Sequence, residues 1–386
     1  MNANHPYHSI IARAPVYPIH RALHILLQRE RFRAPEQEGV TASRFGQAAA
    51  AGVLESGNWP ETAPPRVSIG MPVFNGENYV GQAIESVLAQ SFADFELIVC
   101  DNASTDNTAG ICRTYAARDP RVRYLRNPRN LGAGANFDLC FQLARGTWFQ
   151  WAAHDDMLAP DYVARAVAVL ERRPDVVLCV AGIVEIDAEG AVLRRYATAL
   201  DDMAASDPVR RFGCVIHTHH QCEDFFGVYR RSALCGTGLV GTFSGSDRVL
   251  LAEVALRGPW VRLADHLFLH REHAARATRA LLLVDRAAAV RWLAPQAGPR
   301  QGRLFHLVLY RDYWRVVRRN VAPGRRWGCY RELVRWWVTD GHFADVLRDL
   351  LQSLSPHLLR LARGVKRATL GRHHDLRPGS LPTLER

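Results

Sequence analysis

The chain has 386 residues, of which 48% are hydrophobic and 23% are charged. This length allows two domains, or one large domain with appendages. No window reaches the roughly 18 to 20 uninterrupted apolar residues that a membrane span requires, and residues 1–17 lack the continuous apolar core of a signal peptide. We therefore expect a cytoplasmic globular protein.

The formal net charge of +11 is unevenly distributed along the chain. Residues 257–386 contain 25 Lys and Arg against 10 Asp and Glu, so residues 1–256 carry a balance of −4. A basic C-terminal third is compatible with nucleic acid, with an anionic membrane surface or with a phosphate-bearing substrate. Charge alone leaves these three partners open.

In chain order, residues 1–64 show no sustained periodicity and predict a poorly ordered lead-in with one helix near Ile19 to Arg29. From residue 65, strand, turn and helix alternate, with strands expected at 65–75, 95–101, 122–126 and 147–153. Such alternation with short connections favours an α/β fold with a mostly parallel sheet flanked by helices. We place this domain at 65–278.

The second half of that domain is less regular. We expect a helix at 160–171, a strand at 176–186, an irregular stretch over 191–232 that ends in a buried strand, a helix from 245 and a last strand at 263–270. Beyond the domain, residues 279–370 predict a helical C-terminal extension rich in Arg and Trp. Residues 371–386 predict a disordered tail.

Acidic residues stand where two of the expected strands end. Asp101 closes the second strand, and Asp155 and Asp156 follow the apolar run that begins at Trp148. The crevice outside the carboxyl ends of parallel strands is a common ligand site, and paired acids there suit a divalent cation. The alternative is that Asp155 and Asp156 cap the helix at 160–171.

Four motifs in this order resemble the inverting family 2 glycosyltransferases, which have the nucleotide-diphospho-sugar transferase (GT-A) fold. They are Val67-Ser-Ile-Gly-Met-Pro-Val-Phe-Asn-Gly-Glu77, Glu96-Leu-Ile-Val-Cys-Asp-Asn-Ala-Ser-Thr-Asp106, residues 127–134, and the strand that ends in His-Asp-Asp156. The resemblance covers about residues 66–275. It is strongest in the first ninety of them.

The resemblance implies a nucleotide site at the first two strand ends. Asp101 would bind the base or ribose, and the first loop and its neighbour would surround the nucleotide through Pro72, Asn75, Glu77 and Asp106. For Asn75 and Asp106 the alternative is simple helix capping, for which both residue types are well suited.

The resemblance also implies a divalent metal, Mg²⁺ or Mn²⁺, bound by Asp155 with Asp156 beside it and His273 completing the shell. The family usually shows Asp-x-Asp-Asp at this place, and here Ala153 replaces the first acid. His154 could supply hydrogen bonds to phosphate, or water could fill the metal shell. Arg271 could meet a phosphate.

By the same resemblance, Asp247 would be the base that activates the acceptor hydroxyl. The alternative is an acid at a helix start with no chemical role. The run His217-Thr-His-His-Gln-Cys222 fits no standard zinc spacing, so we expect these residues to line the cleft or the surface.

The implied function is an inverting, metal-dependent glycosyltransferase of bacterial cell-surface polysaccharide or glycolipid synthesis. Its partners would be a nucleotide-sugar donor and a saccharide or lipid-linked acceptor, and not nucleic acid. The clustered Trp and Arg residues of the C-terminal third have the composition of helices that lie on a membrane surface, which would place the protein at the inner face of the membrane. The alternative for these residues is ordinary helical packing with solvated arginines. The alternative, motivated by Ala153, is a catalytically inactive nucleotide-binding module of the same fold.

Overall fold

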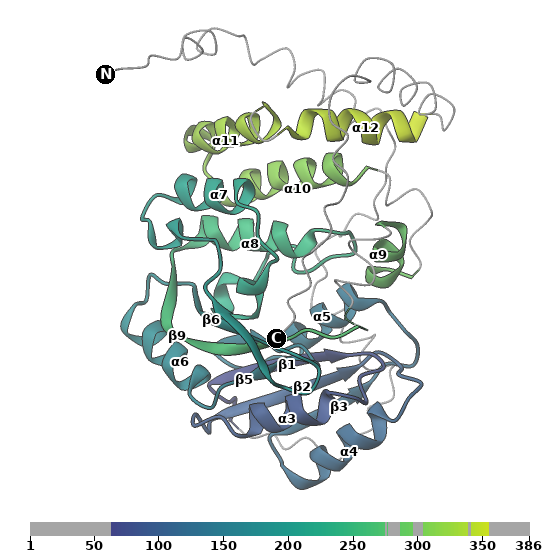
Figure 1. Cartoon of the computed structure of the whole chain (residues 1–386). Helices are drawn as coiled ribbons and strands as arrows, with labels where there is room; N and C mark the ends of the chain where they lie inside the picture. The colour runs from purple at the N-terminus through teal and green to yellow at the C-terminus, as the bar shows by residue number, and fades with distance from the viewer. Residues whose placement is uncertain (1–62, 275, 277–285, 296–303, 339–340, 355–386) are drawn as a thin grey trace, which may run out of the picture. The chain divides into compact units, whose positions relative to one another are not determined.

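The computed structural model describes residues 63–274, 276, 286–295, 304–338 and 341–354. The helix expected near Ile19 to Arg29 and the tail expected at 371–386 lie outside the described residues. Within them, the expected α/β architecture is confirmed: helices flank a central sheet whose strands are mostly parallel (Figure 1).

The described sheet has nine strands in the order β3-β2-β1-β4-β8-β6-β9-β5, with β7 paired to β6. Strands β1 to β4, β6 and β9 run in one direction, and β5, β7 and β8 run antiparallel to their neighbours. Their bounds are β1 Val67–Val73, β2 Phe95–Asp101, β3 Val122–Arg126, β4 Trp148–Trp151, β5 Met157–Leu158, β6 Leu178–Ile186, β7 Val192–Tyr196, β8 Val228–Arg230 and β9 Trp260–Arg271.

The helices of the first half form where apolar residues recur at helical spacing. In α3, for example, Val80, Ala83, Ile84 and Val87 are all buried, as the sequence pattern predicts. The bounds of the helices up to residue 257 are α3 Val80–Leu88, α4 Thr108–Arg118, α5 Ala133–Gln142, α6 Tyr162–Arg172, α7 Pro208–His217 and α8 Ser246–Arg257. Short 3-10 turns lie at η2 Asp202–Ala204, η3 Glu223–Phe226 and η4 Arg231–Ala233.

The stretch 191–232 is more regular than expected. It contains β7 and the ten-residue helix α7. The local signal for α7 is present in the sequence: Asp207 caps the helix by accepting a hydrogen bond from the Val209 N–H, and Pro208 occupies the first turn. The buried strand expected at the end of this stretch is limited to β8, because residues 223–226 form a 3-10 turn before it.

The C-terminal helices are α9 Arg286–Leu293, α10 Phe305–Asn320, α11 Arg326–Val338 and α12 His342–Leu354, with the turn η6 Pro323–Arg325. Helix α10 packs on α8, α11 packs on α7, and α12 packs on both α10 and α11 (Figure 1). Aromatic residues of α10 and α11, such as Tyr313 and Trp336, belong to the same buried cluster as Phe149 and Trp151 of β4. The helical extension therefore shares its core with one face of the sheet.

Six of the eight cysteines are buried, and none of the eight forms a disulfide. None of the described helices is long and apolar enough to cross a membrane.

A buried carboxylate joins α8 to α10. The Glu253 side chain is 1% exposed and accepts hydrogen bonds from Arg319 and from the Asn320 amide, at 3.1 and 2.9 Å, and it also pairs with Arg257. Removing one partner of a buried ion pair leaves the charge of the remaining partners buried and uncompensated.

We predict that Glu253→Ala lowers the free energy of unfolding by about 3 kcal/mol, measured by urea denaturation. Asp175→Ala removes a carboxylate that pairs with Arg173 at the surface, with both side chains more than half exposed, and should leave the transition midpoint unchanged. Equal stability of the two variants would contradict a structural role for Glu253.

Candidate active site

The carboxyl ends of the parallel strands bring the predicted site residues to one edge of the sheet. In the β1–β2 register Val73 lies opposite Asp101, and β4 lies on the other side of β1, with Trp151 opposite Gly70. The loops that follow β1, β2 and β4 therefore emerge next to one another. They carry Asn75, Glu77, Asp106, Asp155 and Asp156.

Hydrogen bonds link the loop after β1 to the loop after β2. The Asn75 side chain accepts from the Thr105 N–H at 2.8 Å, and Glu77 accepts from the Asn107 N–H at 2.9 Å. Asp106 accepts from the Glu77 N–H at 3.0 Å and also from Thr108. Asn75 thus joins two loops and does not cap α3, whose N-cap position is Tyr79. Its backbone is left-handed, with φ 52°, a conformation that asparagine tolerates well.

Asp101 lies fully buried beneath this pair of loops. One of its carboxylate oxygens accepts a hydrogen bond from the Ser104 N–H at 2.8 Å, and the other accepts from the Tyr124 hydroxyl at 2.7 Å. Arg126 lies 3.6 Å from the second oxygen. Pro72 lies within β1, one register position before the Val73–Asp101 pair. Asp101 therefore organises the loop that follows β2.

A network of four asparagines supports the same edge. The Asn102 side chain accepts hydrogen bonds from Asn127 and from the Leu131 N–H, and it donates to Asn130. Asn127 also donates to Asn136, which in turn donates to the Cys100 carbonyl. Sequence reasoning noted residues 127–134 only as part of a motif. Their amide side chains were the available signal, because an amide can donate and accept at once.

The structure brings Asp155 and His273 together. The Asp155 Oδ2 atom lies 3.0 Å from His273 Nε2, and the two side chains are 16% and 9% exposed. Burial opposes ionisation of Asp155, but the electrostatic influence of His154, the hydrogen bond to His273 and the charge of Arg276 together hold the pKa of this carboxyl well below its usual range. Asp155 is therefore ionised at neutral pH.

This pair could supply two ligands to one cation. Adjacent ligands of an octahedral ion with bonds of 2.0–2.1 Å lie about 2.9 Å apart. The separation of 3.0 Å between the carboxylate oxygen and the imidazole nitrogen fits that spacing. The alternative that Asp155 and Asp156 cap the next helix does not match the structure, because β5 intervenes and Asp161 occupies the N-cap position of α6.

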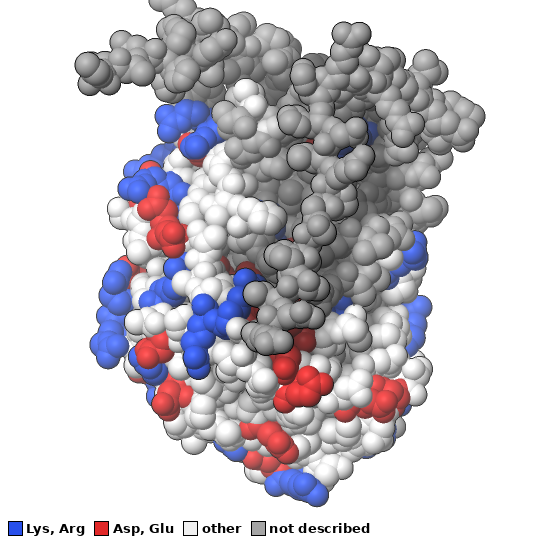
Figure 2. Space-filling model, viewed as in Figure 1, with Lys and Arg blue, Asp and Glu red and all other residues white. Residues whose placement is uncertain are grey.

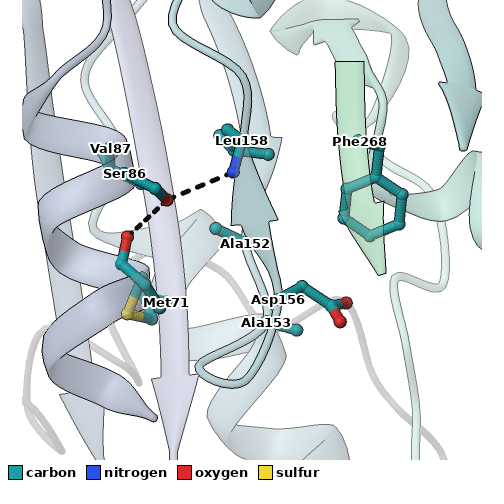
Figure 3. A pocket seen from close by; sticks show the side chains of 9 residues that line it. Met71, Ser86, Val87, Ala152, Ala153, Asp156, Leu158 and Phe268 are labelled. Carbon is teal, nitrogen blue, oxygen red and sulfur yellow. Dashed lines mark hydrogen bonds between the residues drawn. The ribbon is translucent and has the colours of Figure 1, made fainter. Parts of the chain in front are cut away.

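Asp156 points to a different set of partners. It is 5% exposed, its Oδ1 atom accepts a hydrogen bond from the Arg271 N–H at 2.8 Å, and its Oδ2 atom lies 3.3 Å from His270 Nδ1. In Figure 3 the Asp156 carboxylate extends from the turn that also carries Ala153, towards the strand of Phe268. Asp156 thus joins the turn after β4 to the end of β9.

The expectation that Arg271 meets a phosphate is wrong in this structure. The side chain is fully buried, and its guanidinium donates to the carbonyls of Asp155 and Ala188 and to the Gln82 side chain. The guanidinium also lies over the Tyr79 ring, at 4.8 Å from its centroid. With these partners Arg271 joins three segments of the protein and faces no solvent.

Ala153, at the place of the missing acid, lines a small hollow between α3 and the turn after β4 (Figure 3). The lining is apolar except for Ser86 and Asp156, and Ser86 donates to the Ala83 carbonyl and accepts from the Leu158 N–H. His154 packs on the first loop instead: a Cβ atom added to Gly76 would lie 2.6 Å from the His154 ring. Glycine is required there by this close approach.

Asp247 lies in the first turn of α8, where the sequence placed it. Its Oδ1 atom accepts a hydrogen bond from the Arg248 N–H at 2.8 Å. Burial and the charge of Asp247 raise the pKa of the neighbouring Cys222 thiol. The preceding loop is held by Asp138, which accepts a hydrogen bond from the Val240 N–H at 2.9 Å. Burial raises the pKa of Asp138 to about 7.

The histidines of 217–222 point to separate partners. His217 Nε2 lies 3.1 Å from a Glu332 carboxylate oxygen, and His219 is exposed. His220 is buried, accepts a hydrogen bond from the Cys222 N–H, and has its pKa lowered to about 3 by burial and by the charge of Arg248. These residues form the end of α7 and the segment between α7 and η3.

Comparisons with known proteins concern the part of the chain that carries Asp155 and the loops after β1 and β2. Residues 68–235 match the family model of glycosyl transferase family 2. The chain is 37% identical over 109 residues to "Putative glycosyltransferase EpsE" of Bacillus subtilis (strain 168), which is 28% of this chain and 39% of that protein. It is also 37% identical over 99 residues to chondroitin synthase of Escherichia coli, which is 26% of this chain and 14% of that protein. The chain thus spans well under half the length of these relatives.

Among solved structures, the chain is similar to S. aureus TarS 1-349 in complex with UDP. The TM-score is 0.52 at 14% identity, over 80% of this chain and 93% of that chain. At this identity the likeness concerns the fold alone, which is the GT-A fold expected from the sequence motifs. The sheet edge described above thus lies in a chain of which residues 68–235 match the family model of glycosyl transferase family 2.

Proposed function

We propose that this protein transfers a sugar from a nucleotide-diphosphate donor to a hydroxyl acceptor with inversion, in bacterial cell-surface polysaccharide or glycolipid synthesis. The observation that carries the proposal is the Asp155–His273 pair, which lies at the strand ends of a family 2 domain. The names of the relatives support a polysaccharide product, since one of them is a chondroitin synthase.

The nucleotide would bind over the joined loops after β1 and β2. Asn75, Glu77 and Asp106 hold the shape of these loops, and several backbone N–H groups there are already satisfied by side chains. Pro72 lies in β1 directly before the first of these loops. Asp101 would contribute from below, by holding the loop that meets the base or ribose. A rigid loop pair costs less entropy on binding than a mobile one.

Asp155 and His273 would hold a divalent cation, Mg²⁺ or Mn²⁺, near the donor's diphosphate. When bound, such a cation would supply charge stabilisation for the departing diphosphate. Asp155 offers an ionised carboxylate and His273 an imidazole nitrogen. Asp156, bonded to the end of β9, would orient both by holding the turn beside residues 271–273.

Asp247 would accept the proton of the acceptor hydroxyl. Its carboxylate is partly exposed at the first turn of α8, and the N–H of Arg248 orients one of its oxygens. Arg248 also donates to the Thr218 and His220 carbonyls, so the base would be held against the segment between α7 and η3. A positioned base commonly contributes a factor of about 10² to 10⁴ in rate.

We predict that Asp155→Asn raises the Mn²⁺ concentration needed for half-maximal donor hydrolysis at least about tenfold, because it removes an anionic ligand. His273→Gln should act in the same direction. The measurement is a screen of nucleotide-sugar donors for hydrolysis at varied Mg²⁺ and Mn²⁺, with Asp201→Asn as the control, since the Asp201 side chain is 85% exposed. Hydrolysis in Asp155→Asn at the wild-type metal requirement would contradict the assignment.

The alternative suggested by Ala153, a catalytically inactive nucleotide-binding module, predicts a different result in the same experiment. In that case the wild-type protein binds a nucleotide with an affinity indifferent to Mg²⁺ and Mn²⁺ in calorimetry, and it hydrolyses no donor. Metal-dependent hydrolysis of any donor would exclude this alternative.

We predict that Asp247→Asn lowers the rate of sugar transfer by about 10² to 10⁴ and leaves the affinity for the donor nucleotide unchanged, because the carboxylate acts on the acceptor. Transfer rates come from product formation and affinities from calorimetry. Asp247→Glu should recover part of the rate. A loss of nucleotide affinity equal to the loss of transfer would indicate a structural role.

A peripheral membrane contact is also part of the proposal. On α11, Trp327, Arg331, Arg335 and Val338 follow one another at helical spacing and are all exposed, with Trp327 at 64%. On α12, Phe343 and Leu347 are exposed as well. On the face seen in Figure 2, acidic and basic side chains of the described residues are interspersed. The contact would therefore rest on the apolar and Arg side chains of α11 and α12.

We predict that Trp327→Ser together with Phe343→Ser weakens binding to vesicles rich in anionic lipid by about tenfold or more. Each substitution removes apolar surface that would be buried in the membrane on binding. Co-sedimentation measures the effect. Val192→Ser with Leu193→Ser removes equally exposed apolar side chains from β7 and should change nothing. Binding that is insensitive to both pairs, or equal on uncharged vesicles, would contradict the contact.

A further inference from the structure

Two histidines and an aspartate come together between α10 and α12, on elements that carry none of the residues discussed for catalysis. The three are His306 of α10 and His342 and Asp345 of α12, and the ligand atoms they offer all lie within 4.8 Å of one another. His342 and Asp345 lie three residues apart, which places them on one helical face. Residues from separate helices thus converge on one point.

The distances favour a shared ion over hydrogen bonds. The Asp345 Oδ2 atom lies 3.7 Å from His306 Nε2 and 3.7 Å from His342 Nδ1, too far for a hydrogen bond in either case. Ligands of a tetrahedral zinc ion with bonds of 2.0–2.2 Å lie about 3.4 Å apart. The two distances to Asp345 are each close to this spacing, and the ligand atoms of all three residues lie within 4.8 Å of one another.

The surrounding residues orient these ligands. Asp349, which is 1% exposed, accepts hydrogen bonds from the His306 backbone N–H at 2.8 Å and lies 3.1 Å from His306 Nδ1. A carboxylate on Nδ1 directs the lone pair of Nε2 towards Asp345, as in carboxylate–histidine–zinc arrangements. The other oxygen of Asp345 binds Arg348 at 2.5 Å, so Oδ2 is the oxygen that faces the histidines.

The His342 ring is also held in place. It stacks on Trp336 of α11, with ring centroids 4.0 Å apart and an interplanar angle of 22°. The cluster is largely shielded: His306 is 7% exposed, and the side chains of His342 and Asp345 are each 28% exposed. Partial exposure leaves room for a water molecule as a fourth ligand.

We propose that His306, His342 and Asp345 bind a transition-metal ion such as Zn²⁺. The ion would join α12 to α10. Two imidazoles and one carboxylate are ligands that select zinc or a neighbouring first-row ion over Mg²⁺ or Ca²⁺. The site is independent of the proposed catalysis. Its role is to stabilise the docking of α12, because a metal bound only by the folded state adds to stability.

The test is a calorimetric titration of the chelator-treated full chain with Zn²⁺ in excess Mg²⁺. We expect one equivalent of Zn²⁺ to bind in the wild type and in Asp155→Asn. Asp345→Asn and His342→Gln should weaken this binding more than tenfold, and Asp349→Asn about 10- to 100-fold through the orientation of His306. His219→Ala, which removes an exposed histidine, should bind as the wild type does.

Two further readouts separate metal loss from misfolding. Zn²⁺ should raise the melting temperature of the wild type and of Asp155→Asn but not that of Asp345→Asn, while the circular dichroism spectra agree in the absence of metal. Co²⁺ should give the intense visible absorption of a tetrahedral site in the wild type but not in Asp345→Asn. No Zn²⁺ uptake by the wild type, or uptake that survives both Asp345→Asn and His342→Gln, would overturn the proposal.

Discussion

The pairing of the turn after β4 with the end of β9 is the contact on which the candidate active site depends. Asp156 accepts the Arg271 N–H, β5 pairs with β9 so that Met157 lies opposite Leu269, and Arg271 donates to the Asp155 carbonyl. These bonds place His273 beside Asp155, although 118 positions separate them in the chain. Each of them involves a buried backbone or carboxylate group, which is costly to leave unsatisfied. The ligand pair is therefore held by groups that themselves take no part in the proposed chemistry.

The second half of the site is held by a different device. Asn75, Glu77 and Asp106 exchange hydrogen bonds between the loops after β1 and β2, and buried asparagines hold the loop after β3 to the same edge. Side-chain amides and carboxylates that bond to backbone N–H groups satisfy those groups in place of sheet or helix hydrogen bonds and so fix the course of these loops. The proposed nucleotide site and the proposed metal site thus depend on separate networks. They meet at Gly76, where only a hydrogen atom leaves room for the ring of His154.

The C-terminal helices are part of the hydrophobic core of the protein. Tyr313, Leu333 and Trp336 pack in the cluster that includes Phe149 and Trp151 of β4, and Glu253 bonds to α10 from within α8. In the sequence these helices were visible as Arg- and Trp-rich segments, and either membrane contact or ordinary packing agreed with that composition. The structure divides the aromatic residues: Trp336 is buried, whereas Trp327 is mostly exposed. The packing interpretation thus holds for Trp336, and the proposed membrane contact concerns other residues of the same helix, such as Trp327.

The sequence by itself determined the alternation of strands and helices, the positions of β2 and β3, and the acids at the ends of β2 and β4, because periodicity and turn chemistry are local properties. It also supplied the cap of α7, Asp207-Pro208, which our interpretation overlooked. Only the tertiary structure decided that Arg271 is buried, that Asp156 bonds to β9 while Asp155 meets His273, and that His306 lies beside His342 and Asp345. These outcomes depend on which distant strands and helices pack together, and no local pattern in the chain specifies such long-range pairing.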